Sequence, residues 1–192
     1  SSQRGQVLAH SINLVKPRVA LVGEELLDAF EEVQEQLQLP ADGRYYFADR
    51  PTWRDPGQAP AGWQHPAAEL TAQPDTPPLL ARPVQAEDPC FYIYTSGTTG
   101  LPKAVVFNHG RFLKGYGIFG FGAVRLGRDD RLYCSLPFYH ATAMVVCWGS
   151  VLSAGAALIM VRKFSASRFL DDVRRHGATA FGYVGELCRY LL

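Results

Sequence analysis

The sequence predicts an α/β fold in which helices cover the faces of a largely parallel sheet. From about residue 88 onward, short β-branched and aromatic runs alternate with stretches of helical periodicity. A helix between two consecutive strands favours a parallel pair, so this alternation indicates a parallel sheet. Hydrophobic residues make up 47% of the 192 residues and charged residues 19%, which describes a globular chain with a substantial core.

Residues 1–48 are predicted to form a first α/β segment. Its expected elements are a helix over 7–14, a strand over 19–22, a helix over 26–37 and a strand over 45–47. Pro17 ends the first helix. The acidic residues between Glu24 and Glu35 suit a solvated face of the second helix and complement the dipole at its start.

Residues 49–87 are predicted to be an irregular connection. Nine of the thirteen prolines fall between Pro40 and Pro83, and no helical or strand period survives there. We expect Trp53 and Trp63 to pin this connection to the surface of the fold.

Residues 88–192 form the third segment, in which strands and helices alternate. Ser165 and Gly177 are expected to cap the two ends of one helix. Four glycines at 115, 117, 120 and 122 weaken another helix. The predicted strands are 91–94, 104–108, 131–136, 156–161 and 179–184, and the helices are 109–124, 139–153, 165–176 and 185 onward.

A loop of small and hydroxylated residues joins the strands 91–94 and 104–108, and its composition suits phosphate binding. Glycines allow sharp turns, consecutive N–H groups form an anion nest, hydroxyls donate to oxygens, and the lysine adds a positive charge. The predicted phosphate-binding residues are Thr95, Ser96, Gly97, Thr98, Thr99, Gly100 and Lys103. The spacing does not fit the common P-loop, because the lysine lies three residues beyond Gly100 and a strand follows it. The alternative is a Thr/Gly-rich surface hairpin.

The ten residues from Tyr94 to Lys103 resemble the signature loop of the adenylate-forming superfamily. Leu136-Pro137-Phe138-Tyr139-His140 resembles the second core motif of that superfamily. The stretches 163–169 and 183–191, together with Ala104, resemble its fatty acid transport protein or very-long-chain acyl-CoA synthetase branch. The resemblance implies that this chain is part of the N-terminal domain of such an enzyme.

The resemblance implies ATP-dependent activation of a long- or very-long-chain fatty acid. A fatty carboxylate would react with Mg²⁺-bound ATP to give an acyl-adenylate, and CoA would then displace AMP. Tyr139 and His140 would lie on the acyl side. For His140 the alternative is a structural histidine at a helix N-terminus.

The resemblance also implies what lies outside this chain. The superfamily's residues for adenine, ribose and Mg²⁺ would follow Leu192. The missing initiator Met and the apolar end also suggest a fragment, so we expect the isolated chain to be inactive. Spacing identifies no carboxylate pair, metal-ligand cluster or nucleophile–base pair, and we assign no catalytic residue.

Two other functions stay open from the sequence. One is adenylation of another acid, such as an aryl, carnitine-like or amino acid. The other is a non-enzymatic fatty acid transport or nucleotide-sensing module. In addition, residues 132–161 contain no charged side chain and are long enough to span a bilayer, although strand, helix and strand fit them better.

The net charge and the cysteines limit which other partners and which cellular compartment the sequence predicts. The formal net charge of +1 gives no case for nucleic acid binding. Four widely spaced cysteines are typical of a reduced, cytoplasmic protein, and the resemblance adds peripheral membrane association as an option. Arg162, Lys163 and Arg168 form a small basic cluster, and Glu186 with Arg189 predicts a local ion pair.

Overall fold

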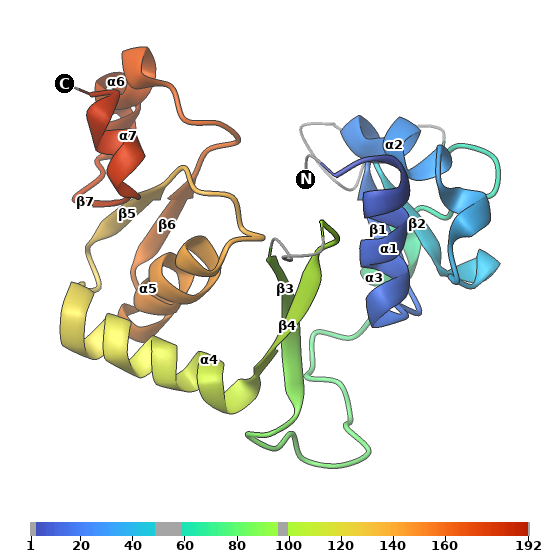
Figure 1. Ribbon diagram of the computed structural model, residues 1–192. Helices are drawn as coiled ribbons and strands as arrows, with labels where there is room; N and C mark the ends of the chain where they lie inside the picture. Colours follow the sequence, from blue (N-terminus) through green and yellow to red (C-terminus); the bar gives the residue numbers. More distant parts are fainter. Residues whose placement is uncertain (1–2, 49–58, 96–99, 192) are drawn as a thin grey trace. The chain divides into compact units, whose positions relative to one another are not determined.

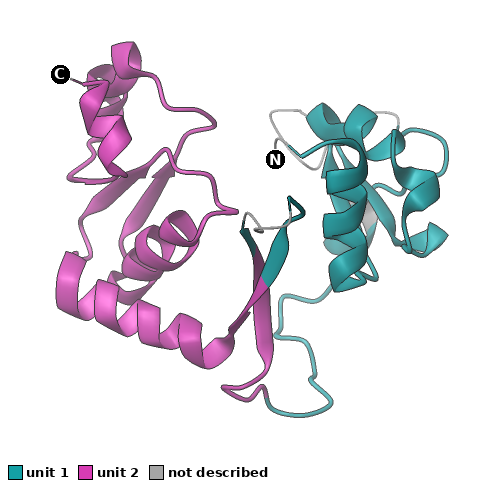
Figure 2. Cartoon of the chain, in the orientation of Figure 1, with its two compact units in different colours: residues 1–83, 94–104 teal, residues 84–93, 105–192 magenta. Residues whose placement is uncertain are grey.

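The computed structural model describes residues 3–48, 59–95 and 100–191 (Figure 1). The chain divides into two compact units (Figure 2). Unit 1 comprises residues 1–83 and 94–104, and unit 2 comprises residues 84–93 and 105–192. The composition-based division into three segments stays a prediction.

Unit 1 begins with helix α1 (Gly5–Val15), which ends at Lys16 before Pro17, as predicted. Strands β1 (Ala20–Gly23) and β2 (Arg44–Phe47) follow at the expected places and pair in parallel. A short 3-10 turn, η3 (Ala41–Gly43), leads into β2.

The prediction of one continuous helix over 26–37 is wrong. The segment consists of η1 (Glu24–Leu26), α2 (Leu27–Glu31) and η2 (Gln34–Gln36). The side-chain amide of Asn13 on α1 donates to the carbonyl oxygen of Gln36, and its oxygen accepts from the backbone N–H of Gln38, each at 2.8 Å. These bonds provide hydrogen-bond partners on another element for the backbone that follows α2, so this backbone does not need to continue as a helix. Helical periodicity alone could not show where the helix would be interrupted.

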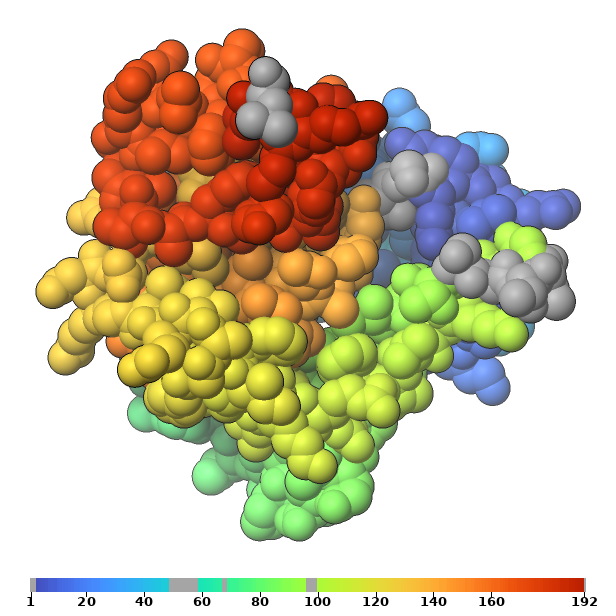
Figure 3. All heavy atoms as spheres, turned by 60° about the vertical axis from the view of Figure 1, so that its left-hand side comes forward, coloured from blue at the N-terminus to red at the C-terminus, as the bar shows by residue number. Residues whose placement is uncertain are grey.

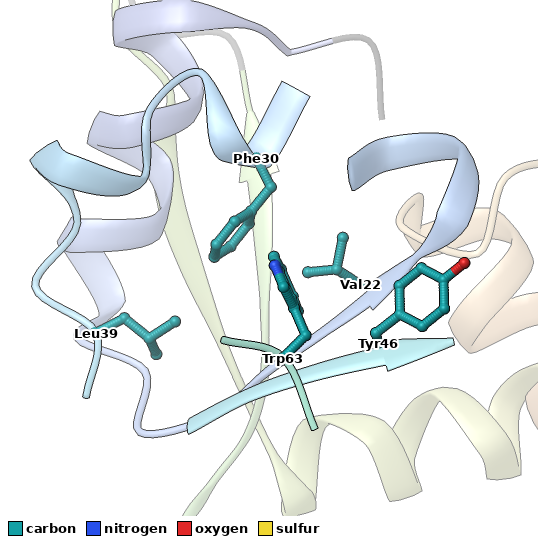
Figure 4. Close-up of a cluster of buried hydrophobic side chains, with 5 residues drawn as sticks. All are labelled: Val22, Phe30, Leu39, Tyr46 and Trp63. Carbon is teal, nitrogen blue, oxygen red and sulfur yellow. The ribbon is translucent and has the colours of Figure 1, made fainter. Parts of the chain in front are cut away.

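Five side chains from distant parts of unit 1 form its hydrophobic core (Figure 4), namely Val22, Phe30, Leu39, Tyr46 and Trp63. The rings of Phe30 and Trp63 meet edge to face with 5.1 Å between centroids. Trp63 is only 8% exposed. It is therefore a core residue and not the surface anchor that the sequence suggested, while Trp53 lies outside the described residues.

The described part of the proline-rich connection contains regular structure at two places. Gln64 lies alongside β2, where its carbonyl accepts from Tyr46 N–H at 2.8 Å and its own N–H donates to Arg44 O at 2.9 Å. Helix α3 (Ala67–Thr71) follows. Between Gln73 and Asp88 the described residues contain no helix or strand.

Strands β3 (Pro89–Thr95) and β4 (Lys103–Asn108) lie where they were predicted, and together they form a two-stranded sheet. Asn108 ends β4 and caps the next helix, because its side-chain oxygen accepts from Arg111 N–H at 2.7 Å. That helix begins as α4 (His109–Gly115) and continues as the π-helical segment η4 (Tyr116–Val124).

Two of the four glycines in this helix allow a close crossing with the helix formed by η5 (Thr142–Cys147) and α5 (Trp148–Ala154). A Cβ on Gly115 would lie 2.4 Å from Val145 Cγ1, and one on Gly120 would lie 2.0 Å from Ser153 Oγ. A Cβ on Gly117 or Gly122 would meet nothing within 4 Å. Ile118 and Phe121 of η4 are exposed. The segment 116–124 that contains them is yellow in Figure 3.

The main sheet of unit 2 has the order β6-β5-β7, and both pairs are parallel. Its strands are β5 (Arg131–Cys134), β6 (Ala157–Met160) and β7 (Ala180–Gly182). Leu132 and Cys134 pack in one cluster with residues of η5 and α5. Tyr133 packs against Phe169 of α6 (Ala166–His176), with 5.5 Å between ring centroids. Since neighbours on a strand point to opposite faces, helices cover both faces of this sheet, as predicted.

A hydrogen-bond network connects the residues at the N-terminal ends of β5 and β7. Thr179, just before β7, donates its hydroxyl to one carboxylate oxygen of Asp130 at 2.6 Å, and Gly127 N–H donates to the other at 2.6 Å. Arg131 N–H donates to the Thr179 hydroxyl at 3.0 Å. These bonds lower the pKa of Asp130, the bond from Thr179 having the larger effect.

The ends of the last two helices differ in how far they match the predictions. Ser165 precedes α6, but its hydroxyl pairs with Ser167 and makes no capping bond to a backbone N–H. Gly177 ends α6 with φ +60°, as expected. In α7 (Gly185–Arg189) the predicted ion pair between Glu186 and Arg189 is present at 2.5 Å.

The stretch 132–161 folds as β5, the η5–α5 helix and β6, which overturns the membrane-span alternative. Across the part of the chain that the structure describes, every helix is too short or too polar to cross a bilayer.

Candidate functional site

The predicted phosphate-binding residues start at the end of β3 and finish at the start of β4. Thr95 is the last residue of β3 and Lys103 the first of β4, and both are exposed. Ser96, Gly97, Thr98 and Thr99 lie outside the described residues. The structure thus describes the two ends of the loop.

Gly100 adopts a left-handed backbone conformation, with φ +86°. A Cβ at this position would meet no described residue within 4 Å. The backbone angle therefore favours glycine here.

Helix α1 holds both ends of the loop through hydrogen bonds within unit 1. The Tyr94 hydroxyl donates to the carbonyl oxygen of Ser11 at 2.5 Å. On the other side, the Nε2 of His10 lies 3.1 Å from the carbonyl oxygen of Pro102. A carbonyl only accepts, so Nε2 carries the proton of this bond. Spacing in the sequence could not reveal either bond, because the two partners of each bond lie more than eighty residues apart.

The predicted acyl-side residues follow β5 in unit 2. His140 N–H donates to Pro137 O at 2.9 Å, and its ring Nδ1 accepts from Thr142 N–H at 3.2 Å. His140 therefore accepts a backbone N–H bond at the start of η5, as the structural alternative expected, and its ring is exposed. With Nδ1 accepting, a neutral ring has its proton on Nε2, where it can donate to an oxygen. The neighbouring Tyr139 side chain is 64% exposed.

A chain of aromatic contacts connects the segment before His140 with the strands that carry the loop. Phe138 meets Trp148 with 6.4 Å between ring centroids, and Trp148 meets Phe112 at 5.6 Å. Phe112 meets Phe91 on β3 at 5.4 Å, and Phe91 stacks on Phe107 of β4 at 5.7 Å. All five rings belong to unit 2. Within this unit, the contacts connect Phe91 of β3 and Phe107 of β4 with α5.

Two buried thiols, Cys134 and Cys147, belong to the core cluster against which Leu136 and Phe138 pack. The hydrogen bond between them lowers the pKa of Cys134 and raises that of Cys147. Neither thiol was predicted to take part in the site, and Cys90 and Cys188 are likewise free. Among the residues that the structure describes, no three His, Cys, Asp or Glu side chains are grouped so that they could hold a metal ion.

Comparison with known proteins finds one family over nearly the whole chain. A family model described as AMP-binding enzyme matches residues 2–192. A medium/long-chain-fatty-acid–CoA ligase of Mycobacterium tuberculosis is 43% identical over 190 residues, which cover 99% of this chain and 29% of that protein. Long-chain fatty acid transport protein 6 of Mus musculus is 36% identical over 194 residues, which cover 100% of this chain and 29% of that protein.

The fold is shared with solved ligase structures. The crystal structure of an anthranilate CoA ligase in complex with anthranoyl-AMP matches with a TM-score of 0.76 at 22% identity. That match covers 94% of this chain and 33% of the ligase chain. The chain thus spans 29% of the length of the two curated relatives and about a third of that solved structure.

Proposed function

Since this chain belongs to the AMP-binding enzyme family, we propose that it supplies the phosphate-binding part of an ATP-dependent acyl-CoA synthetase for long- or very-long-chain fatty acids. The observation that carries the proposal is the Tyr94–Lys103 motif, which starts at the end of β3 and finishes at the start of β4. The fatty-acid–CoA ligase of Mycobacterium tuberculosis, at 43% identity, supports the substrate class.

The proposed reaction has two steps. A carboxylate oxygen attacks the α-phosphorus of ATP, and the bond to pyrophosphate breaks to leave acyl-AMP. The CoA sulfur, after losing its proton, then attacks the acyl carbonyl carbon and AMP leaves. Because both reactants of the first step are anions, catalysis depends on positioning and on neutralising charge.

The loop would contribute this neutralisation through its own residues. Backbone N–H groups of a glycine-containing turn and the threonine and serine hydroxyls from Thr95 to Thr99 would donate to phosphate oxygens. Lys103 would add its ammonium group at the start of β4. Mg²⁺ would add further positive charge on the phosphates. The described residues offer no cluster to hold Mg²⁺, so we assign it no ligand in them.

His140 and Tyr139 would act on the acyl side. The Nε2–H of a neutral His140 ring is available to donate to a carboxylate oxygen, since Nδ1 is engaged by Thr142 N–H.

The first experiment measures pyrophosphate release by the full-length protein that carries this chain, with ATP and a panel of acids. We expect long-chain fatty acids to be preferred over aryl, carnitine-like and amino acids. Lys103→Ala should lower the rate by about 10²-fold, because it removes a positive charge from the developing pyrophosphate.

The control is Lys114→Ala, which removes an exposed lysine from α4 and leaves the loop unchanged. Its rate should stay within about twofold of the unmodified protein. Preference for a non-fatty acid would replace the substrate class. Equal rates for Lys103→Ala and Lys114→Ala would remove Lys103 from the site.

Fatty acid transport is a second candidate, which the name of the mouse relative favours. Under this function a cytoplasmic protein associated peripherally with the membrane would move fatty acid without needing adenylation. Uptake of labelled fatty acid by cells expressing Lys103→Ala separates the two functions. Loss of uptake together with pyrophosphate release supports the synthetase, and retained uptake supports transport.

A further inference from the structure

We infer that His10 and Tyr94 are positioning residues that fix the two ends of the phosphate-binding loop to α1 and thereby set the affinity for ATP. The inference rests on the proposed function, because it concerns the same loop. It adds two residues that would act on the nucleotide without contacting it.

The two bonds leave from consecutive residues of one helix. The Tyr94 hydroxyl, immediately before Thr95, donates to Ser11 O at 2.5 Å. The His10 ring reaches Pro102 O, immediately before Lys103, at 3.1 Å. The entry and exit of the loop are therefore attached to adjacent positions on α1.

Helix α1 is itself fixed within unit 1, so it can serve as a frame for the loop. Ala9 and Ser11 are buried on its inner side. Asn13, one half-turn beyond, bonds to the backbone of Gln36 and Gln38 at 2.8 Å each. A displacement of the loop ends relative to α1 would have to break at least one of these contacts.

Fixing the ends should raise affinity by lowering the entropy that binding costs. A loop with glycines and small side chains has many accessible conformations when its ends are unrestrained. Anchors that hold those ends in the free protein reduce the freedom that is lost when phosphate binds. Pro102 adds to this effect, because its ring fixes φ close to the bond that His10 makes.

The test uses the full-length protein and measures the KM for ATP and for fatty acid separately. His10→Phe and Tyr94→Phe each keep an aromatic ring and remove the donor. Each should raise the KM for ATP about five- to tenfold, as expected for one lost hydrogen bond, and leave the KM for fatty acid unchanged. His10→Gln, whose side-chain N–H can replace the Nε2–H, should restore most of the affinity.

Ser11→Ala is the matched control on the same helix. Its hydroxyl donates to Val7 O within α1, at 2.9 Å, and takes no part in holding the loop. This variant should keep the KM for ATP within about twofold, since the Ser11 carbonyl that accepts from Tyr94 is unchanged.

A second measurement does not depend on activity. Amide hydrogen exchange at residues 100–104 of the nucleotide-free protein should be faster in His10→Phe and Tyr94→Phe than in Ser11→Ala. Unchanged exchange and an unchanged KM for ATP would overturn the inference. So would an equal rise of both KM values, which would indicate a general loss of structure. Absence of ATP-dependent pyrophosphate release by the unmodified protein would instead refute the proposed function.

Discussion

Asp130 illustrates what a single side chain does at the N-terminal edge of the unit 2 sheet. Its carboxylate accepts from the Thr179 hydroxyl and from Gly127 N–H, and these bonds lower its pKa. A carboxyl group whose pKa is lowered in the folded state stabilises the protein at pH values above its unfolded-state pKa of about 3.9. This contribution is lost as the pH falls through the lowered folded-state pKa.

Asp130→Asn should therefore destabilise the protein at pH 7 and have a progressively smaller effect below about pH 4. Urea unfolding of both proteins at several pH values measures this difference. Asp129→Asn, at the exposed neighbouring position, should change the free energy of unfolding by less than about 0.5 kcal/mol at pH 7. A loss of stability in Asp130→Asn that is the same at pH 7 and pH 3 would contradict the assigned cause.

Residues were predictable from the sequence where their role is local. The Gly177 helix stop and the Glu186–Arg189 pair follow from spacing alone, and the structure contains both. The bond from His10 to Pro102 joins residues 92 positions apart, and no periodicity reports such a contact. His140 lies between these cases, because its bond from Thr142 N–H is local while its proposed role toward the acyl group depends on the fold.

The crossing of two helices in unit 2 depends on glycine at two particular positions. Gly120 lies so close to Ser153 that a methyl group has no room, whereas the position of Gly122 is open. Gly120→Ala should lower the free energy of unfolding by about 1–3 kcal/mol, since overpacking forces side chains and backbone apart. Urea unfolding measures the change.

Gly122→Ala on the same segment is the matched comparison. It should be neutral or stabilise by up to about 1 kcal/mol, because alanine favours helix over glycine. Equal effects of the two substitutions would mean that helix propensity, and not the close contact with Ser153, determines the stability of this crossing.

Elements were predicted well where a single periodic pattern covers them. The strands β1 to β7 and the helices α1 and α6 lie where β-branched runs and apolar spacing placed them, to within a few residues. The break of the 26–37 helix and the burial of Trp63 were missed, because both depend on contacts with parts of unit 1 that are distant in sequence. The four glycines were interpreted as weakening a helix, whereas two of them permit its packing.

At the scale of the whole molecule, the short coverage of the curated relatives leads to a direct expectation. The chain spans 29% of the fatty-acid–CoA ligase of Mycobacterium tuberculosis. The 192-residue chain alone should therefore form no acyl-CoA from ATP, CoA and fatty acid, whereas the full-length protein should. Thin-layer or mass-spectrometric detection of acyl-CoA, with heat-treated protein as the blank, measures both. Product above the blank from the isolated chain would show that these residues suffice.

The class of the fold was predictable because strand–helix alternation and parallel pairing are linked by chain geometry. Its division into two units was not, because residues 94–104 belong to unit 1 through contacts that composition does not reveal. The loop motif located the candidate site in the sequence. The attachment of the loop ends to α1 became visible only in the structure.

The distance along the chain between His10 and Pro102 also bears on biosynthesis. A ribosome adding about 5–20 residues per second needs roughly 5–18 s to translate the 92 positions between them. During that interval α1 has already been synthesised, but the imidazole of His10 and the carbonyl group of Ser11 still lack their partners, Pro102 and Tyr94. Slow codons placed between these two positions would lengthen the interval before Pro102 becomes available to His10.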